Sequence, residues 1–244
     1  MALGSVVSST SQPPLHTHFT AFLDTLYAQD QMTESKIDGE TSRRVLDVSN
    51  MNIEDLIDMF PNIEPFLIRK WHYAFFTFFD LTGNNVIEWR DFQTLIDAIG
   101  AVRGVGGADH TAAQHSLTDV WRSMTDTIHK DVQEKITLVD WIGMWADSLT
   151  AEKEPEWQKS YLAYMFRLLD ASGDELVDLS EYVEVLGYFS IPREEAISCF
   201  DKFATDLEGG QFNSIDYKRF EKLWQQYFRS TDINDVGNHL LGAF

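Results

Sequence analysis

The 244-residue sequence predicts an all-α protein in which four helix-loop-helix units pair into two lobes of one compact body. The first observation is a repeat. Four loops are each followed by an aromatic residue with apolar residues three and four positions later, the spacing of one buried helix face. The second is a β-branched residue five positions before each aromatic, which suits a short antiparallel strand. Strands of this kind would join neighbouring loops and so pair the units two by two.

The repeat also predicts how the chain is divided. The β-branched residues are Ile87, Ile136, Val177 and Ile215, and the exiting helices carry Phe92/Leu95/Ile96, Trp141/Met144/Trp145, Tyr182/Val185/Leu186 and Phe220/Leu223/Trp224. Gly100 to Gly107 is expected to link the first two units, and Lys153-Glu154-Pro155 to separate the halves. We therefore place an N-terminal pair of units at residues 61–150 and a C-terminal pair at residues 151–244.

Residues 1–60 precede the repeats and are predicted to form an N-terminal helical extension. Residues 1–18 are rich in Ser, Thr and Pro, as disordered tails are. Apolar residues between 19 and 27 follow at the spacing of an amphipathic helix, and a second apolar group runs from Val45 to Phe60. The extension is interpreted either as a packed accessory helix pair or as a regulatory or docking arm.

The third loop, residues 170–181, carries the most complete set of oxygen ligands. Positions 1, 3, 5, 9 and 12 are Asp170, Ser172, Asp174, Asp178 and Glu181, and the backbone carbonyl of Leu176 stands at position 7. This is the spacing of an EF-hand calcium loop, in which alternate oxygens point inward and the last carboxylate gives two. Glu175 replaces the glycine expected at position 6, which makes the bend costlier. We expect this loop to bind Ca²⁺.

The first loop, residues 80–91, has the same pattern with weaker ligands. Positions 1, 3, 5, 7, 9 and 12 are Asp80, Thr82, Asn84, Val86 (through its carbonyl), Glu88 and Asp91. Asn85 replaces the position-6 glycine, and asparagine tolerates the left-handed conformation of that turn. The short Asp91 is poorly suited to giving two oxygens, and fewer ligands at shorter range favour six-coordinate Mg²⁺. We expect a site that binds less selectively than the third loop.

The second and fourth loops are predicted to stay free of metal. The second offers His129, Asp131, Gln133, Thr137 and Asp140, with the cation Lys135 in its middle. The fourth offers Glu208, Gly210, Phe212, Asp216 and Arg219, so that a cation replaces the last carboxylate and Phe212 cannot ligate. Each lobe would thus have one filled and one empty loop, the empty one serving pairing and core.

Charge and composition limit the classes of function. The formal net charge of −20 argues against nucleic-acid binding, because a phosphate partner requires a basic face. The single cysteine, Cys199, excludes an internal disulfide. No apolar run reaches the ~18 residues of a membrane span. The first 30 residues hold no Lys or Arg, which argues against a targeting segment. We expect a soluble, cytoplasmic monomer.

Two further segments carry a family resemblance. The exiting helix Trp141-Ile142-Gly143-Met144-Trp145 and the tail Gly237-Asn238-His239-Leu240-Leu241-Gly242, with the order of the loops, resemble the calexcitins, a neuronal branch of the invertebrate sarcoplasmic calcium-binding proteins. The resemblance covers residues 63–244. It implies two compact EF-hand lobes acting in calcium-dependent signalling or buffering, with a GTP-binding role also proposed for the family. The first and third loops match the family's metal pattern, and the second departs from it at His129, Gln133 and Asp140.

The sequence therefore predicts a calcium sensor or buffer without catalysis. A sensor exposes a Met-rich groove when it binds calcium, whereas 7 Met and 13% aromatic residues favour a fixed, buffer-like core. One alternative is a nucleotide-dependent kinase resembling juvenile hormone diol kinase, although the chain has no G-x-x-x-x-G-K-[ST] loop. Another is a carrier of an apolar small ligand, since related EF-hand proteins hold coelenterazine between their lobes.

Overall fold

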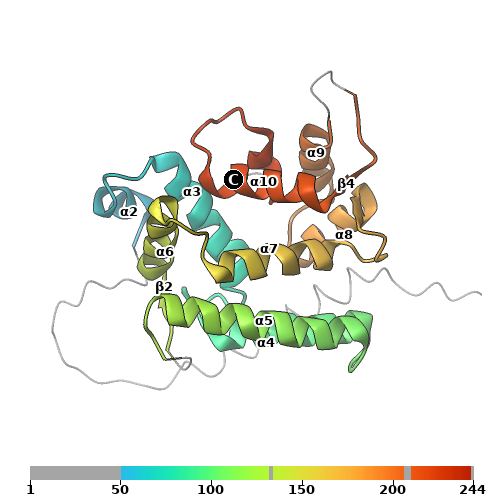
Figure 1. Ribbon diagram of the computed structural model, residues 1–244, viewed down its shortest axis with the longest axis horizontal. Helices are drawn as coiled ribbons and strands as arrows, with labels where there is room; N and C mark the ends of the chain where they lie inside the picture. Colours follow the sequence, from blue (N-terminus) through green and yellow to red (C-terminus); the bar gives the residue numbers. More distant parts are fainter. Residues whose placement is uncertain (1–50, 132–133, 206–209, 243–244) are drawn as a thin grey trace, which may run out of the picture.

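A computed structural model of the chain describes residues 51–131, 134–205 and 210–242. Four helix-loop-helix units follow one another, as predicted (Figure 1). The first two comprise α3 (Pro65–Ala74), the π-helical turn η2 (Phe75–Phe79), β1 (Val86–Ile87) and α4 (Trp89–Arg103), then α5 (Ala108–Thr127), β2 (Ile136–Thr137) and α6 (Leu138–Thr150). The last two comprise α7 (Glu156–Leu169), β3 (Leu176–Asp178) and α8 (Leu179–Tyr188), then α9 (Arg193–Phe203), β4 (Ser214–Asp216) and α10 (Tyr217–Arg229). A short helix α2 (Ile53–Met59) precedes them and a 3₁₀ turn η3 (Val236–His239) follows.

The loops pair through their strands. β1 and β2 run antiparallel with Ile87 opposite Ile136, and β3 and β4 run antiparallel with Val177 opposite Ile215. None of these four side chains is more than 2% exposed. Each pair therefore closes the apolar side of two loops, while the backbone bonds fix their register. The pairing predicted from the β-branched residues is confirmed.

The link between the first two units is shorter than predicted. Helix α4 continues through Gly100 to Arg103, so the prediction that the link starts at Gly100 is wrong. A Cβ atom at Gly100 would lie only 2.8 Å from Cδ2 of His110 on α5. This glycine therefore permits the close approach of α4 and α5. Gly104 and Gly106, with φ of 99° and 75°, form the turn between the two helices.

A tryptophan cluster joins the two halves of the described chain. Trp71 on α3 lies 6.1 Å from Trp145 on α6 between ring centroids, and its indole N–H donates to the carbonyl of Phe228 on α10 (2.9 Å). Trp141 and Trp157 pack on Trp145, with centroids 5.7 and 5.0 Å away. Large buried rings contribute strongly to stability through their area and edge-to-face contacts. The first unit is thus fixed to the last.

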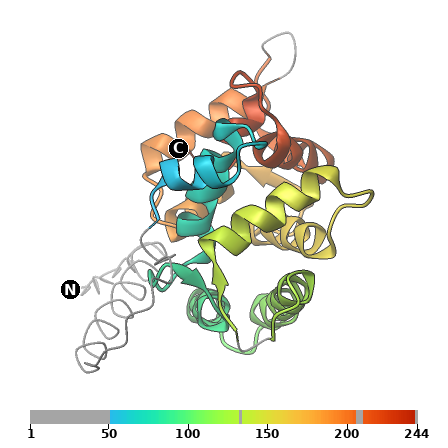
Figure 2. The ribbon, with the colours of Figure 1, turned by 90° about the vertical axis from the view of Figure 1, so that its left-hand side faces the viewer.

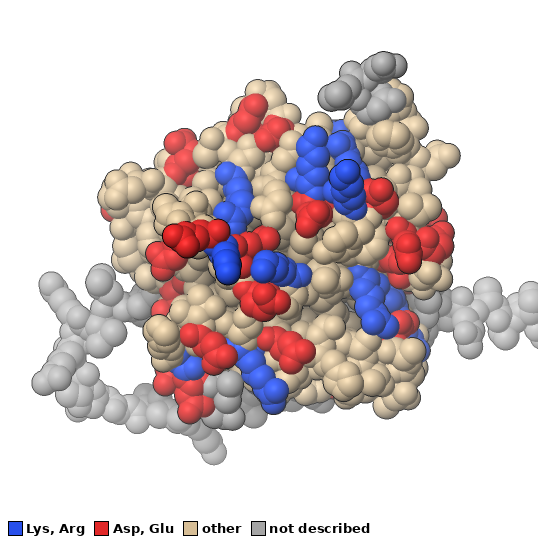
Figure 3. Space-filling view, in the orientation of Figure 1, with Lys and Arg blue, Asp and Glu red and all other residues tan. Residues whose placement is uncertain are grey.

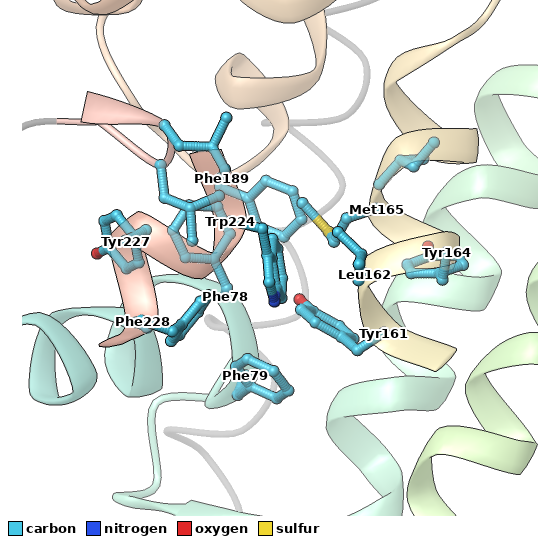
Figure 4. Close-up of a cluster of buried hydrophobic side chains, with 14 of the residues drawn as sticks. Phe78, Phe79, Tyr161, Leu162, Tyr164, Met165, Phe189, Trp224, Tyr227 and Phe228 are labelled. Atoms are coloured by element: carbon cyan, nitrogen blue, oxygen red, sulfur yellow. The ribbon is translucent and has the colours of Figure 1, made fainter. Parts of the chain in front are cut away.

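The interior next to this cluster is also filled by aromatic side chains. Figure 4 shows Phe79 of the first unit facing Tyr161 of α7, where their ring centroids are 4.4 Å apart. Tyr161 in turn lies 5.8 Å from Trp224 on α10. A cavity between Phe79, Phe92 and Tyr161 measures about 10 Å³, room for about one water molecule. This part of the core is therefore closely packed.

The helices lie in layers around this core. Figures 1 and 2 show α4 and α5 side by side along one edge, with α7 packed against α5. Helix α3 contacts both α6 and α10. None of the described helices combines the length and the apolar character needed to cross a membrane.

The N-terminal extension is described only at its end. The tail predicted at residues 1–18, the helix predicted near residues 19–27 and the start of the second apolar group at Val45 lie outside the described residues. The end of that group forms α2, which begins with a capping box between Asn52 and Asp55 and buries Leu56 completely against α3.

Candidate metal sites in the four loops

The third loop begins at the C-terminal end of α7, where Asp170 turns back onto the loop. Its carboxylate accepts hydrogen bonds from the backbone N–H groups of Gly173 (2.8 Å), Asp174 (3.1 Å) and Glu175 (3.1 Å). These bonds orient the first predicted ligand towards the inside of the loop. Glu175 has a φ of 67°, so the non-glycine residue at position 6 does adopt the left-handed conformation.

The same loop ends in a capping box at the start of α8. Oε1 of Glu181 accepts a hydrogen bond from the N–H of Ser172 (2.8 Å), and Oε2 accepts one from the N–H of Asp178 (3.0 Å). The side chain of Asp178 in turn accepts from the N–H of Glu181 (2.9 Å). Asp174 accepts from the N–H of Leu176 (3.0 Å). Both oxygens of Glu181 therefore face the loop, and the predicted carboxylates are all held by backbone donors.

The first loop has the same connections in a buried setting. Asp80 is 2% exposed and accepts from the N–H groups of Asn84 and Asn85, both at 3.0 Å. Asp91 is 1% exposed and accepts from the N–H (2.8 Å) and hydroxyl (2.9 Å) of Thr82 and from the N–H of Glu88 (2.8 Å). Asn85 has a φ of 63°, which confirms the predicted left-handed turn.

Burial controls the charge of these two carboxyl groups. It raises the pKa of Asp91 to about 7, although the three hydrogen bonds act in the opposite direction. It also raises the pKa of Asp80 above its ordinary value. A cation entering the first loop would therefore compete with a proton on Asp91 near neutral pH.

In the second loop the cation that opposes the ligands is Lys130 and not the predicted Lys135. Lys130 lies 2.6 Å from Oδ2 of Asp140, whereas Lys135, predicted to oppose the ligands, instead reaches Glu88 of the first loop (3.3 Å). Although burial alone would raise it, the bonds from Lys130 and Thr137 hold the pKa of Asp140 below its ordinary value. His129 has a φ of 54° and turns the chain so that Lys130 points into the loop. Gln133 lies outside the described residues.

In the fourth loop, Arg219 occupies the position of the last ligand, as predicted, and its side chain bonds to the beginning of the loop. Its Nη2 donates to the carbonyls of Phe203 (2.9 Å) and Thr205 (3.3 Å), at the end of α9 and just beyond it. The side chain of Phe212 is 44% exposed. Glu208 lies outside the described residues.

The acidic groups of the two candidate loops do not enclose a preformed cavity for an ion. Among the described residues, no group of three or more His, Cys, Asp or Glu side chains is arranged to hold a metal. The carboxylates accept hydrogen bonds from loop N–H groups instead, so metal binding would require them to exchange these donors for the ion.

One connection of the third loop was not foreseen from the sequence. Tyr182 directly follows Glu181, and its hydroxyl donates to the carbonyls of Leu240 (2.9 Å) and His239 (3.2 Å) in the C-terminal tail. The tail is thus tied to the first turn of α8. The only signal in the sequence was an aromatic residue that also fitted a core position.

Paired helix-loop-helix units joined by short strands, with these loops between them, define an EF-hand protein. No protein-family model matches the chain. The chain is 31% identical over 192 residues to Calexcitin-1 of Caenorhabditis elegans, and the match covers 79% of this chain and 94% of that protein. It is 24% identical over 186 residues to sarcoplasmic calcium-binding proteins I, III and IV of Branchiostoma lanceolatum, covering 74% of this chain and 98% of those proteins. The chain therefore belongs to the calexcitin and sarcoplasmic calcium-binding protein family, which confirms the predicted resemblance.

Two solved structures share the fold. A sarcoplasmic calcium-binding protein from amphioxus matches with a TM-score of 0.62 at 24% identity, over 75% of this chain and 99% of that one. Apoaequorin in complex with (S)-HM-daCTZ matches with a TM-score of 0.53 at 13% identity, over 84% of this chain and 97% of that one. At these identities the likeness is evidence of the fold alone.

Proposed function

We propose that this is a cytoplasmic, monomeric calcium-binding protein whose principal site is the third loop. The observation that carries the proposal is that this loop alone places acids at positions 1, 5, 9 and 12, with both oxygens of Glu181 facing the loop. Ca²⁺ would be held by the side chains of Asp170, Ser172, Asp174, Asp178 and Glu181 and the carbonyl of Leu176. The names of the relatives, all calcium-binding proteins or calexcitin, support the choice of ion.

The first loop is proposed as a second, weaker site that also accepts Mg²⁺. Its ligands would be the side chains of Asp80, Thr82, Asn84, Glu88 and Asp91 and the carbonyl of Val86. Two features weaken it: Asp91 must lose a proton held with a pKa of about 7, and Lys135 already partners Glu88. The shorter carboxylate at position 12 supports a six-coordinate ion.

The second and fourth loops are proposed to bind no metal. In each, a cation occupies the place where a dication would need negative oxygens: Lys130 on Asp140, and Arg219 on the carbonyls of Phe203 and Thr205. Their contribution is structural, because their strands complete the two loop pairs.

Within the class of calcium-binding proteins, a buffer-like role is supported over a groove-opening sensor. A sensor must separate its helices to expose an apolar groove. Here α3 is fixed between α6 and α10 by the tryptophan cluster, and Trp71 also donates a hydrogen bond to the backbone of α10. Opening would break this packing between the halves.

Neither alternative function gains support. None of the named relatives is a kinase. A carrier that encloses an apolar ligand between the lobes would need an empty space there, whereas the cavity between Phe79, Phe92 and Tyr161 has room for about one water molecule. We therefore propose no enzymatic activity, and the net charge of −20 supports the absence of a nucleic-acid partner.

Calorimetric titration tests the two sites. The full chain should bind Ca²⁺ at two sites, and Glu181→Gln should weaken the tighter one by about a hundredfold, because it removes a charged, two-oxygen ligand. Glu175→Gln is the matched control in the same loop, since position 6 contributes no ligand, and should change affinity by less than about threefold. Absence of heat on addition of Ca²⁺, or an equal loss of Ca²⁺ affinity in the two variants, would contradict the proposal.

A dye that binds apolar surface separates buffer from sensor. The proposed buffer should show nearly equal dye fluorescence with and without Ca²⁺, because its core stays closed. A strong increase on addition of Ca²⁺ would assign the protein to the sensors.

A further inference from the structure

The first three loops close their C-terminal ends in the same way. In each, the carboxylate at position 12 accepts a hydrogen bond from the backbone N–H at position 9. The bonds run from Glu88 to Asp91 (2.8 Å), from Thr137 to Asp140 (2.8 Å) and from Asp178 to Glu181 (3.0 Å). The second loop therefore has the shape of its neighbours at this end, although we propose no metal for it.

The three carboxylates differ in their other partner. In the first and third loops the carboxylate also accepts from the N–H at position 3, which belongs to Thr82 (2.8 Å) and Ser172 (2.8 Å). In the second loop the ammonium of Lys130, at position 2, lies 2.6 Å from Oδ2 of Asp140. The same ammonium donates to the backbone carbonyl of Lys135 at position 7 (2.9 Å).

Positions 7 and 12 are both metal-ligand positions of an EF-hand loop. The ammonium of Lys130 is thus bound by two oxygens that would otherwise face an ion. A lysine ammonium is a compact point charge with three donors, and its two distances are only slightly longer than the about 2.3–2.6 Å of a bond from Ca²⁺ to oxygen. Figure 3 shows basic side chains among acidic ones at the lower left of the molecule, where α5 leads into β2.

The oxygens that bind this ammonium belong to the segment that pairs with the first loop. Lys135 immediately precedes β2, and Asp140 accepts from both the N–H (2.8 Å) and the hydroxyl (2.7 Å) of Thr137 in that strand. Thr137 lies opposite Val86 in β1, whose carbonyl is a proposed ligand of the first loop. Lys130 therefore anchors the strand that sets the register of this ligand.

We propose that the ammonium of Lys130 takes the place of a metal ion in the second loop and thereby positions the first loop for metal binding. The inference rests on the metal site proposed above for the first loop. A ligand that orders a shared element lowers the cost of binding at the site next to it. Here the shared element is the β1–β2 pair, and a side chain of the protein has already ordered it. Lys130 is a positioning residue, because it touches no ligand of the first loop itself.

A Ca²⁺ titration followed at the backbone amides of Gly83 and Asn85 measures the first loop alone, because both residues lie within it. Lys130→Gln should weaken the Ca²⁺ affinity of this loop by about fivefold, the lower end of the usual coupling between two sites. Lys135→Gln is the matched control, since it keeps the backbone carbonyl that Lys130 binds. It should raise the affinity, because it releases Glu88.

The two variants separate position from charge. Each removes one positive charge from the second loop, and charge alone would strengthen the binding of a cation to the first loop in both. Only a positioning role gives a loss of affinity in Lys130→Gln. A role in stability alone would lower the midpoint of thermal unfolding and leave the affinity of the folded protein unchanged.

Hydrogen exchange in the metal-free chain tests the same role without an ion. The backbone amides of residues 86–87 and 136–137 should exchange at least about fivefold faster in Lys130→Gln than in wild type, because β2 loses its anchor. The amides of residues 176–178 and 214–216, in the other strand pair, provide the internal reference and should keep their rates.

Two results would overturn the proposal. The first is a Ca²⁺ affinity of the first loop that is unchanged or higher in Lys130→Gln. The second is equal exchange of the β1 and β2 amides in this variant and in wild type. Absence of Ca²⁺ binding by the first loop of the wild-type chain would instead contradict the metal site proposed for that loop, whereas the exchange rates test Lys130 in either case.

Discussion

The first and third loops have the same backbone design, yet their last carboxylates lie in different environments. Glu181 is partly exposed and reaches back over the third loop to two N–H groups. Asp91, one methylene shorter, is 1% exposed and lies beneath Thr82, which donates to it twice. The comparison teaches that the two loops differ in burial as well as in the number of oxygens offered to a metal, since Asp80 is buried too while Asp170, of equal length, is partly exposed. Burial decides how much water surrounds a carboxylate, and hence how readily the group ionises.

The largest expected effect is on the pH dependence of stability, through the carboxyl group of Asp91. Its folded pKa of about 7 lies above its unfolded value of about 4. The contribution to stability is therefore complete below pH ~4 and is lost as pH rises through 7. The free energy of unfolding of the metal-free protein should fall by roughly 2–3 kcal/mol between pH 5 and 8 through this group, and Asp91→Asn should lack that part of the slope.

Chemical denaturation at several pH values measures this slope. Asp97→Asn is the control, because Asp97 is exposed on the same helix, and it should keep the wild-type slope. If the Asp91→Asn variant also keeps the wild-type slope, the last carboxylates of the two loops do not differ in how readily they ionise. In wild type, metal affinity of the first loop should rise with pH across the same range, since the metal replaces the proton.

An intermediate effect is expected at Lys130. Lys130→Gln removes the ion pair with the partly buried Asp140 and should destabilise the protein by about 1 kcal/mol at pH 7. The pKa of Asp140 is lowered in the folded state, so this contribution is present above about pH 4 and is lost as pH falls through the lowered value. Lys153→Gln, which removes an exposed cation between the halves, should change stability little. Equal effects of the two variants would show that the ion pair adds nothing.

The smallest expected effect is on metal affinity, through the ion pair between Lys135 of the second loop and Glu88 of the first. Lys135→Gln releases Glu88 and should raise the metal affinity of the first loop by about twofold to threefold at low salt. The gain should shrink at high salt, because Lys135 is largely exposed and its field is screened. Unchanged affinity at low salt would mean that the Lys135–Glu88 pair does not compete with the metal.

The sequence was sufficient to predict features that depend on a few neighbouring residues. The β-branched Ile87 and Ile136 could be matched because strand pairing needs only a short extended segment, and the turn at Asn85 follows from what its side chain tolerates. The opposing cation in the second loop could not be chosen correctly. Lys130 and Lys135 both lie within the loop, and the path of the chain after His129 decides which one reaches Asp140.

Contacts between distant segments were equally beyond sequence reasoning. The bond from Lys135 to Glu88 depends on the register of β1 and β2, and that from Tyr182 to the tail depends on how the whole C-terminal half packs. Gly100 was taken as a linker residue because a glycine cluster follows it. Its role in the approach of α4 to α5 depends on His110, ten residues away.

The tryptophan cluster has a consequence for spectroscopy. Six of the seven tryptophans are buried, and four of them, Trp71, Trp141, Trp145 and Trp157, lie within energy-transfer distance of one another. Their fluorescence should be blue-shifted, resistant to aqueous quenchers and depolarised by transfer among the rings, and it will report the separation of the two halves. Trp89, partly exposed beside the first loop, emits from a wetter environment. Red-edge emission would therefore follow events at that loop, while the blue edge follows global unfolding.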